Sequence, residues 1–253
     1  MGKIVVITAG KGGCGKTLLT AALGSTLADL GKKVCLLDAC LGMRSLDLAL
    51  DMQDRVVFDL YDLSEEICGV EQALLSVRDR LSMVAAPQQD LPGGFGEKQF
   101  ARVIERLKSR FDYLLVDTPG ALSAITLLAV RHADEAVLVT LPCTAGERNT
   151  ERAASILREQ TDIPLHLLMN CCPKPRSGES EIFDPEAISA YLDLPLLGAV
   201  PLHEAAFAAC LPWTQAGAWP EKVQSAVREA ALRLDGKSIP LKAWKERRFP
   251  WRF

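Results

Sequence analysis

The sequence has no long apolar run, no paired cysteine motif and no strong excess of either charge. A membrane-spanning helix needs roughly eighteen consecutive apolar residues. The apolar run that begins at Ile4 stops at glycines well short of that, and is also too short for a secretory signal. The eight cysteines form no Cys-x-x-Cys pair, and a disulfide framework is typical of shorter, secreted chains. A formal net charge of −3 gives no general attraction to nucleic acid. We therefore expect a cytoplasmic protein with reduced thiols.

Short apolar segments alternate with helical patterns along the chain. The expected strands are apolar at nearly every position, which is typical of strands covered on both faces. They are residues 3–9, 33–38, 81–86, 113–117, 135–141, 165–170 and 197–200. The expected helices include residues 17–30, 97–110, 122–132 and 150–160. This repetition predicts a three-layer α/β fold, a mainly parallel twisted sheet flanked by helices, over residues 1–236.

Residues 10–17 match the Gly-x-x-x-x-Gly-Lys-[Ser/Thr] pattern of a phosphate-binding loop. An apolar strand precedes them and a helical pattern follows, as this motif requires. Glycines let backbone N–H groups converge on phosphate oxygens, and the helix N-terminus adds a favourable dipole. In such loops the lysine, here Lys16, reaches the β- and γ-phosphates, and the hydroxyl, here Thr17, binds Mg²⁺. The sequence therefore predicts ATP and Mg²⁺ as cofactors.

A second part of this site is expected at Asp117. Its carboxylate ends an apolar strand and precedes a turn that contains Gly120. Because hard cations prefer carboxylate and water oxygens, Asp117 is placed to hold Mg²⁺ through water. The alternative is an aspartate that only caps the next helix. Gly120 suits a loop that moves when a γ-phosphate is present.

A lysine directly after the first glycine departs from the common phosphate loop. The segment Lys11-Gly12-Gly13-Cys14-Gly15-Lys16-Thr17 resembles the deviant Walker A motif of the MinD/ParA family of ATPases. Similarity to that family extends to residues 36–48, 57–63, 117–120, 169–170 and 198–201. Of these, residues 117–120 resemble its switch II segment, and the last two segments resemble its adenine pocket. The resemblance covers about residues 1–235 and is closer to the MinD branch than to plasmid-partition ParA proteins.

The resemblance implies an ATP-dependent sandwich dimer in which Lys11 reaches across the interface to the partner's phosphates. It also implies a regulatory protein partner, a Min-type inhibitor or activator. The implied catalytic residues are Lys11, Lys16 and Asp38. The implied nucleotide contacts are Lys11, Gly12, Gly13, Cys14, Gly15, Lys16, Thr17, Leu18, Asn170 and Pro201. The implied magnesium ligands are Thr17, Asp38 and Asp117.

Two positions depart from the family pattern. MinD proteins carry a carboxylate two residues after Asp38, where this chain has Cys40. A thiol with an ordinary pKa of about 8.5 is mostly neutral at pH 7 and does not replace a carboxylate. ATP binding is thus better supported than hydrolysis, which we expect to be slow unless Asp47 or a partner residue positions water. Cys143 replaces a frequently acidic residue in a region that bears on partners.

Two other functions stay open at this point. One is a scaffold that holds nucleotide with little or no hydrolysis, which the thiol at position 40 favours. The other is a ParA-like partition ATPase that uses DNA as its surface, which the small negative net charge disfavours.

The composition changes at residues 237–253. Six basic residues stand there against one acidic residue, with two tryptophans and two phenylalanines among them. Basic side chains are attracted to anionic headgroups, and aromatic rings prefer the membrane interface. MinD proteins end in a short membrane-targeting helix, so the resemblance implies peripheral attachment to the inner face of the cell membrane in the ATP-bound state. A tail packed on the domain is the alternative, and nucleic acid is a weaker one because only this segment is basic.

The cysteines offer one competing site. Some relatives in the wider family carry iron–sulfur clusters, which need converging thiolates. Cys171 and Cys172 are adjacent, so at the end of a strand they would point to opposite faces. We expect the cysteines to be small buried side chains instead.

Overall fold

The computed structural model describes residues 2–89, 95–173, 184–203, 213 and 219–241. The strands are β1 (Lys3–Thr8), β2 (Val34–Asp38), β3 (Leu75–Arg78), β4 (Leu81–Val84), β5 (Tyr113–Asp117), β6 (Glu135–Thr140), β7 (Leu165–Cys172) and β8 (Leu196–Pro201). The helices are α1 (Lys16–Asp29), α2 (Leu46–Ala49), α3 (Leu60–Ser64), α4 (Val70–Ala73), α5 (Glu97–Leu107), α6 (Ala124–Arg131), α7 (Thr144–Gln160), α8 (Pro185–Leu192) and α10 (Glu221–Leu234), with a 3₁₀ turn at Gln53–Arg55. Strands and helices alternate along most of the chain, as the sequence pattern predicts.

The strands form one sheet in the order β3-β4-β2-β5-β1-β6-β7-β8. All neighbours are parallel except β3 and β4, which are antiparallel. In the register of the central strands, Asp117 of β5 lies beside Ile7 of β1 on one side and Asp38 of β2 on the other. The carboxyl ends of these three strands therefore meet at one edge of the sheet, where ligands bind in open α/β folds.

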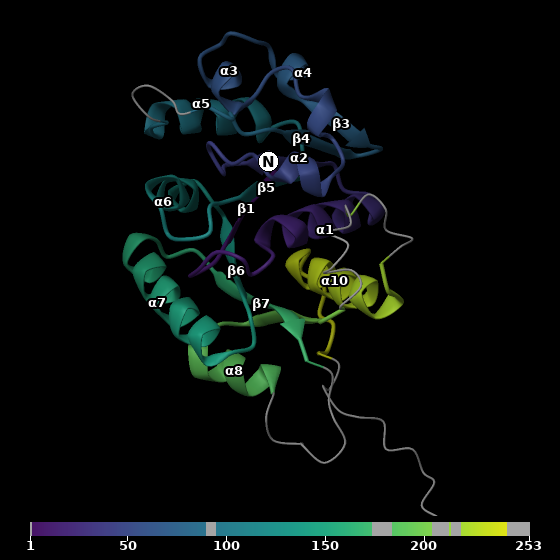
Figure 1. The fold of residues 1–253 in the computed structure, drawn as a ribbon, viewed down its shortest axis with the longest axis vertical. Coiled ribbons are helices and arrows are strands. Elements are labelled where there is room, and N and C mark those ends of the chain that lie inside the picture. Colours follow the sequence, from purple (N-terminus) through teal and green to yellow (C-terminus); the bar gives the residue numbers. More distant parts are fainter. Residues whose placement is uncertain (1, 90–94, 174–183, 204–212, 214–218, 242–253) are drawn as a thin grey trace, which may run out of the picture.

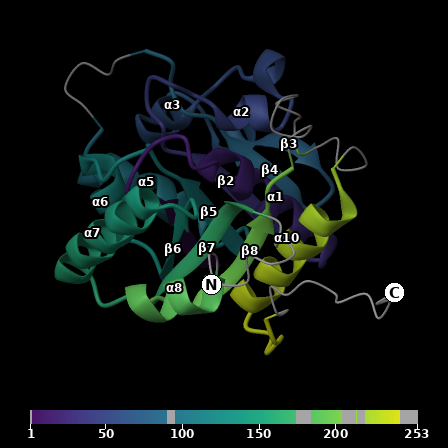
Figure 2. The same cartoon turned by 60° about the horizontal axis from the view of Figure 1, so that its bottom comes forward.

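Helices cover both faces of the sheet (Figure 1). Alternate residues of β1 enter opposite cores: Val5 and Ile7 pack in one, with α1 and α10, and Ile4 and Val6 in the other, with α3 to α8. This two-sided burial explains why the central strands are apolar at every position. Turned by 60°, the structure again places α10 beside β8 and α1 (Figure 2).

The predicted fold class is confirmed, and most strand limits lie within two residues of the expected ones. The sequence missed β3 and the short helices α2, α3 and α4. It also placed the start of α7 at residue 150, whereas the helix begins at Thr144. The earlier start has a local cause, because the Cys143 thiol accepts a hydrogen bond from the Gly146 backbone N–H at 3.4 Å and caps the helix.

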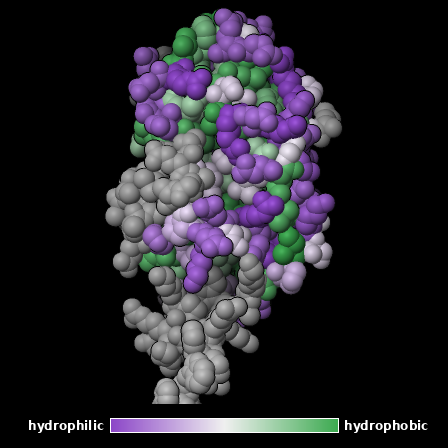
Figure 3. Space-filling view, turned by 90° about the vertical axis from the view of Figure 1, so that its right-hand side faces the viewer, coloured by the Kyte–Doolittle hydropathy of each residue, from purple (hydrophilic) through white to green (hydrophobic). Residues whose placement is uncertain are grey.

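The surface and the C-terminal end bear on the membrane prediction. No helix among the described residues is both long and apolar enough to span a membrane. On the side of α10, hydrophilic and hydrophobic residues are interspersed over the described surface (Figure 3). After α10, Arg233 donates hydrogen bonds to the carbonyls of Ile239 and Pro240, at 2.9 and 2.8 Å. The chain therefore stays attached to the domain as far as Pro240, and residues 242–253 lie outside the described part.

Candidate nucleotide-binding site

The loop between β1 and α1 has the backbone shape of a phosphate cradle. Gly13 and Gly15 adopt φ angles of 75° and 84°, in the left-handed region that side-chain-bearing residues rarely enter. Gly15 is the N-cap of α1 and offers no side chain to cap the helix. The first N–H groups of α1 thus lack a side-chain acceptor, which is the arrangement that binds phosphate oxygens in other proteins.

Close backbone contacts hold this loop on three sides. A Cβ on Gly10 would lie 2.1 Å from the carbonyl oxygen of Asn149 in α7. A Cβ on Gly120 would lie 2.6 Å from the Cα of Gly12. Gly15 packs against the side-chain amide of Asn170. Only glycine fits these approaches, so the turn after β5 and helix α7 both touch the loop directly.

The two lysines of the loop have different surroundings. Lys16 is only 6% exposed, yet its ammonium makes no hydrogen bond or ion pair with any described residue. The side chain is buried along its length while the ammonium itself keeps contact with solvent, so a phosphate oxygen can become its charged acceptor. Lys11 is half-buried at the start of the loop. Its carbonyl accepts a weak hydrogen bond from the Cys14 thiol at 3.6 Å.

Asp117 is bound by two threonine hydroxyls of α1. Thr17 donates to one carboxylate oxygen at 2.6 Å, and Thr20 donates to the other at 3.2 Å. The hydroxyl oxygen of Thr17 keeps its lone pairs for a cation. Thr20 was missed by sequence reasoning, although its position three residues after Thr17 places it on the same helix face. Asp117 thus binds α1 directly, and no helix-capping role is needed to explain it.

Asp38 is fully buried and held by backbone groups. Its carboxylate accepts hydrogen bonds from the N–H groups of Cys40, Ser45 and Leu46, at 2.8, 3.1 and 3.0 Å. The Cys40 thiol points toward Asp117, with its sulfur 3.7 Å from a carboxylate oxygen. Asp38, Cys40 and Asp117 therefore form one buried cluster at the carboxyl ends of β2 and β5.

Burial makes this cluster electrostatically unfavourable when no cation is bound. Burial raises the pKa of Asp38 to about 6, against the lowering effect of the three backbone hydrogen bonds. The pKa of Asp117 rises to about 7, first through burial and then through the charge of Asp38. Burial and the two carboxylates also raise the pKa of the Cys40 thiol, so this thiol is neutral at pH 7.

Of the two residues that the resemblance assigns to an adenine pocket, Asn170 contacts the loop. The Asn170 side chain donates a hydrogen bond to the Cys14 carbonyl at 2.9 Å, and a Cβ on Gly15 would lie 2.3 Å from its amide nitrogen. Within the described part of the chain the Cys14 carbonyl is the acceptor of this amide, so its second N–H is available to a ligand. Pro201 ends β8, the neighbour of β7. The predicted contacts thus come from three places far apart in the sequence.

The residues present fit a magnesium–nucleotide complex. Lys16 lacks an acceptor, the glycine loop presents backbone donors, and the oxygens of Thr17, Asp38 and Asp117 are the donor type that Mg²⁺ prefers. Leu18 differs from the rest, since its side chain packs partly against the core that contains α1.

Comparisons with known proteins agree with this geometry. The family model ParA, described as NUBPL iron-transfer P-loop NTPase, matches residues 1–212. The septum site-determining protein MinD of Bacillus subtilis is 33% identical over 251 residues, 97% of this chain and 94% of the relative. This chain belongs to the MinD/ParA family of P-loop ATPases.

Solved structures of this family extend the similarity to the fold. A chain of the MinC:MinD cell division complex of Aquifex aeolicus superposes with a TM-score of 0.83 at 30% identity, covering 96% of this chain and all of that one. MinD of Pyrococcus horikoshii in complex with Mg-ADP gives a TM-score of 0.75 at 27% identity, covering 93% and 96%. The family prediction is confirmed over nearly the whole length of both chains.

Asp47, Cys171 and Cys172 bear on two alternatives that the sequence left open. Asp47, which we considered as a group that positions water, is 1% exposed and forms an ion pair with Arg44 at 2.6 Å. Its carboxylate is thus occupied by an arginine that lies just before α2. Cys171 and Cys172 do not join a cluster: within the described residues, the one group of three potential metal ligands is Asp38, Cys40 and Asp117.

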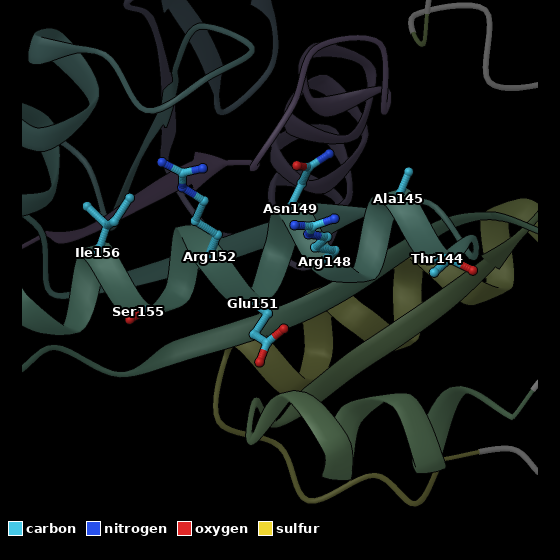
Figure 4. A pocket seen from close by; sticks show the side chains of 8 residues that line it. All are labelled: Thr144, Ala145, Arg148, Asn149, Glu151, Arg152, Ser155 and Ile156. Atoms are coloured by element: carbon cyan, nitrogen blue, oxygen red, sulfur yellow. The ribbon is translucent and has the colours of Figure 1, made fainter.

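A surface hollow lies along α7, the helix that touches Gly10 (Figure 4). Its lining residues are Thr144, Ala145, Arg148, Asn149, Glu151, Arg152, Ser155 and Ile156. Asn149 and Arg152 point to one side of the helix and Glu151 to the other (Figure 4). Any molecule bound in this hollow would touch the helix that packs on the phosphate loop.

Proposed function

We propose that this chain is a MinD-like ATP switch that acts in the placement of the cell division site. ATP binds with Mg²⁺ at residues 10–17 and brings two copies of the chain together. The dimer then attaches to a membrane and binds a regulatory protein. The observation that carries the proposal is the lysine pair on one glycine loop: Lys16 is a buried residue whose ammonium has no acceptor among the described residues, and Lys11 is half-buried at the start of the loop.

Exposed apolar side chains support dimerisation at the nucleotide end. Met43, Leu48 and Val57 are 79%, 57% and 77% exposed, and all three follow β2, whose carboxyl end forms the site. Exposed apolar side chains that gather in one segment are typical of interaction surfaces. In the dimer that we propose, this segment and Lys11 face the partner copy.

The chain's own groups have distinct parts in hydrolysis. Lys16 and the backbone N–H groups bind and orient the phosphates. Lys11 of the partner copy adds positive charge where negative charge develops on the phosphate oxygens in the transition state. Bound Mg²⁺ supplies neutralisation of the phosphate charge. Asp38 and Asp117 would hold that cation with their carboxylates. Cys40 leaves the site without a second carboxylate after β2, so water is poorly positioned and hydrolysis is slow.

Replacing Cys40 by aspartate should raise the basal ATPase rate by roughly 100-fold, the low end of what a positioned acid or base contributes. The measurement is phosphate release at saturating ATP and Mg²⁺. Cys40→Asn has a similar size without the charge and serves as the matched control. A wild-type rate already as high as that of Cys40→Asp would show that another group positions the water.

A second candidate function is favoured by the same thiol. If neither the wild type nor Cys40→Asp releases phosphate faster than ATP does without protein, while ATP still drives assembly, the chain is a scaffold that holds nucleotide without useful turnover. Binding and assembly would then be its function, and the cycle would be reset by nucleotide exchange. The ATP switch and the scaffold thus differ in the rate of phosphate release.

We infer that residues 237–253 form a tail that attaches the dimer to anionic membranes. One tail offers little apolar area, so it gives weak, reversible attachment. Two tails on one dimer make the second attachment intramolecular, and avidity rises by roughly 100-fold or more. The anchoring of residues 239 and 240 by Arg233 fixes where each tail leaves the domain. Localisation to the inner face of the cell membrane in the ATP state follows from this coupling.

Truncation after Leu241 should abolish ATP-dependent sedimentation with anionic vesicles while keeping the contacts of Arg233. Full-length protein should sediment more with an ATP analogue than with ADP, and less at high salt, because the attraction is screened over about 8 Å at physiological ionic strength. Full-length protein with Trp244 and Trp251 replaced by alanine separates apolar insertion from charge. Equal sedimentation of truncated and full-length chains would show that the tail is not the anchor.

The protein partner is proposed from the relatives. A structural neighbour is a MinC:MinD complex, so one member of the family binds a division protein directly. We propose that a Min-type regulator of this chain contacts the hollow along α7, because that helix packs on Gly10 and thereby senses the phosphate loop. Nucleic acid is not part of the proposal.

A further inference from the structure

Cys40 completes a buried group of potential metal ligands. One oxygen each of Asp38 and Asp117 and the Cys40 sulfur all lie within 4.8 Å of one another. Cys40 is 7% exposed, and both aspartates are fully buried. Within the part of the chain that the structure describes, no other group of three His, Cys, Asp or Glu side chains meets this spacing.

The donor set differs from that of a magnesium site. Mg²⁺ takes oxygen ligands almost without exception, whereas a thiolate is a soft ligand that selects zinc-like cations. A tetrahedral Zn²⁺ with bonds of about 2.3 Å to sulfur and about 2.1 Å to oxygen places those two ligands about 3.6 Å apart. The Cys40 sulfur lies 3.7 Å from a carboxylate oxygen of Asp117. That sulfur–oxygen spacing therefore suits a shared thiophilic ion, and an oxygen of Asp38 lies within 4.8 Å of both atoms.

The surrounding residues orient the ligands. Asp38 is fixed by three backbone N–H groups, and Asp117 by the hydroxyls of Thr17 and Thr20. Hydrogen bonds of this kind orient the side chains that bind a metal directly. They require no nucleotide, because every donor belongs to the chain.

Charge balance also favours a divalent ion. When Cys40 binds a metal it releases its proton to solvent, which leaves three negative charges on Asp38, Cys40 and Asp117. Lys16 is the cation whose charge acts on both Cys40 and Asp117. One divalent cation neutralises the remaining two negative charges in a buried site, where unbalanced charge is costly.

We propose that Asp38, Cys40 and Asp117 form a direct binding site for a thiophilic divalent cation of the zinc class in the nucleotide-free chain. This site goes beyond the proposed ATP switch, since its ligands come from the chain alone. Occupation engages both carboxylates that a magnesium–nucleotide complex would use, so the bound cation opposes nucleotide binding. The substitution at position 40 thereby makes the site responsive to soft metals.

Cadmium tests the proposal because its bond to a thiolate absorbs in the ultraviolet. Nucleotide-free, full-length protein is titrated with Cd²⁺ and followed by ultraviolet difference absorbance and calorimetry. Cys40→Ser should lose the absorbance of one thiolate–cadmium bond. The Cd²⁺ affinity of that site should fall by at least about 100-fold, which is the largest loss typical of replacing a residue that only hydrogen-bonds to a metal ligand. Cys35→Ala is the matched control, since Cys35 is also buried in β2 but lies outside the cluster and should change nothing.

Cys40→Asp provides a second readout. It keeps three ligands but makes all of them oxygen, so its preference should shift from Cd²⁺ toward Mn²⁺ and Mg²⁺ relative to the wild type. Equal Cd²⁺ binding by Cys40→Ser and wild type would overturn the proposal, as would an unchanged ion preference in Cys40→Asp. Titrations of the same proteins with ATP and Mg²⁺, without Cd²⁺, are scored separately, so failure of the ATP switch and failure of this site remain distinguishable.

Discussion

Lys16→Ala should lower the affinity for ATP by about 100-fold or more, the range expected when a hydrogen bond to a charged group is lost along with its point charge. The ammonium has no hydrogen-bonding partner among the residues that the structure describes, so its acceptor is expected from the ligand. The same absence predicts that the variant folds normally, because no internal hydrogen bond is removed. Isothermal calorimetry with ATP and Mg²⁺ measures the effect.

Lys98→Ala is the matched control for this loss. Lys98 lies exposed on α5 and should bind ATP like the wild type when replaced. If Lys16→Ala kept the wild-type affinity, the nucleotide would not bind at residues 10–17, and the assignment of the site would be wrong.

Lys11→Ala should weaken the ATP-dependent dimer on the order of 100-fold, within the range for truncating one partner of a buried charge pair across an interface. Its effect on ATP binding by the monomer should be much smaller than that of Lys16→Ala, because in the proposed dimer Lys11 acts on the other copy's phosphates. Light scattering across a range of protein concentrations with ATP analogue gives the dimer dissociation constant.

The contrast between the two lysines is the informative part of this experiment. If Lys11→Ala loses ATP affinity as a monomer and keeps the dimer, Lys11 belongs to its own phosphate loop. If it changes neither, the lysine is only a solvated loop residue, and the resemblance at this position has no functional consequence.

The parts of the fold that depend on local pattern were predictable. Buried parallel strands are apolar at every position, so β1, β2 and β5 could be located within a residue or two. The phosphate loop is set by a short run of glycines followed by Lys16 and Thr17; in the structure Gly13 and Gly15 adopt positive φ angles and Thr17 binds Asp117. Asp117 could be placed at the site because parallel strands end at the same edge.

The parts that depend on distant contacts were not predictable. Asn170 binds the Cys14 carbonyl across 156 positions of sequence, and the family resemblance assigned it only to the adenine pocket. The edge strand β3 is short and antiparallel, with a mixed burial pattern that resembles a loop. The backbone cradle around Asp38 depends on how the segment after Cys40 folds back, which no periodicity reveals.

The start of α7 shows a further limit. A cysteine is not among the preferred N-cap residues, so Cys143 gave no start signal. The thiol nevertheless accepts the hydrogen bond from Gly146, and the helix gains a turn and a half that packs beside the phosphate loop. Without that turn, neither the hollow along α7 nor the contact between α7 and Gly10 could be foreseen.

The most direct test of the ATP switch is a structure of the full-length chain with a non-hydrolysable ATP analogue and Mg²⁺. The account predicts a two-fold dimer in which the ammonium of each Lys16 binds the phosphates of its own loop. Each Lys11 should lie within ion-pair distance of the other copy's phosphates. A monomer with nucleotide bound and Lys11 in solvent would contradict it, as would a dimer that leaves both loops outside the interface.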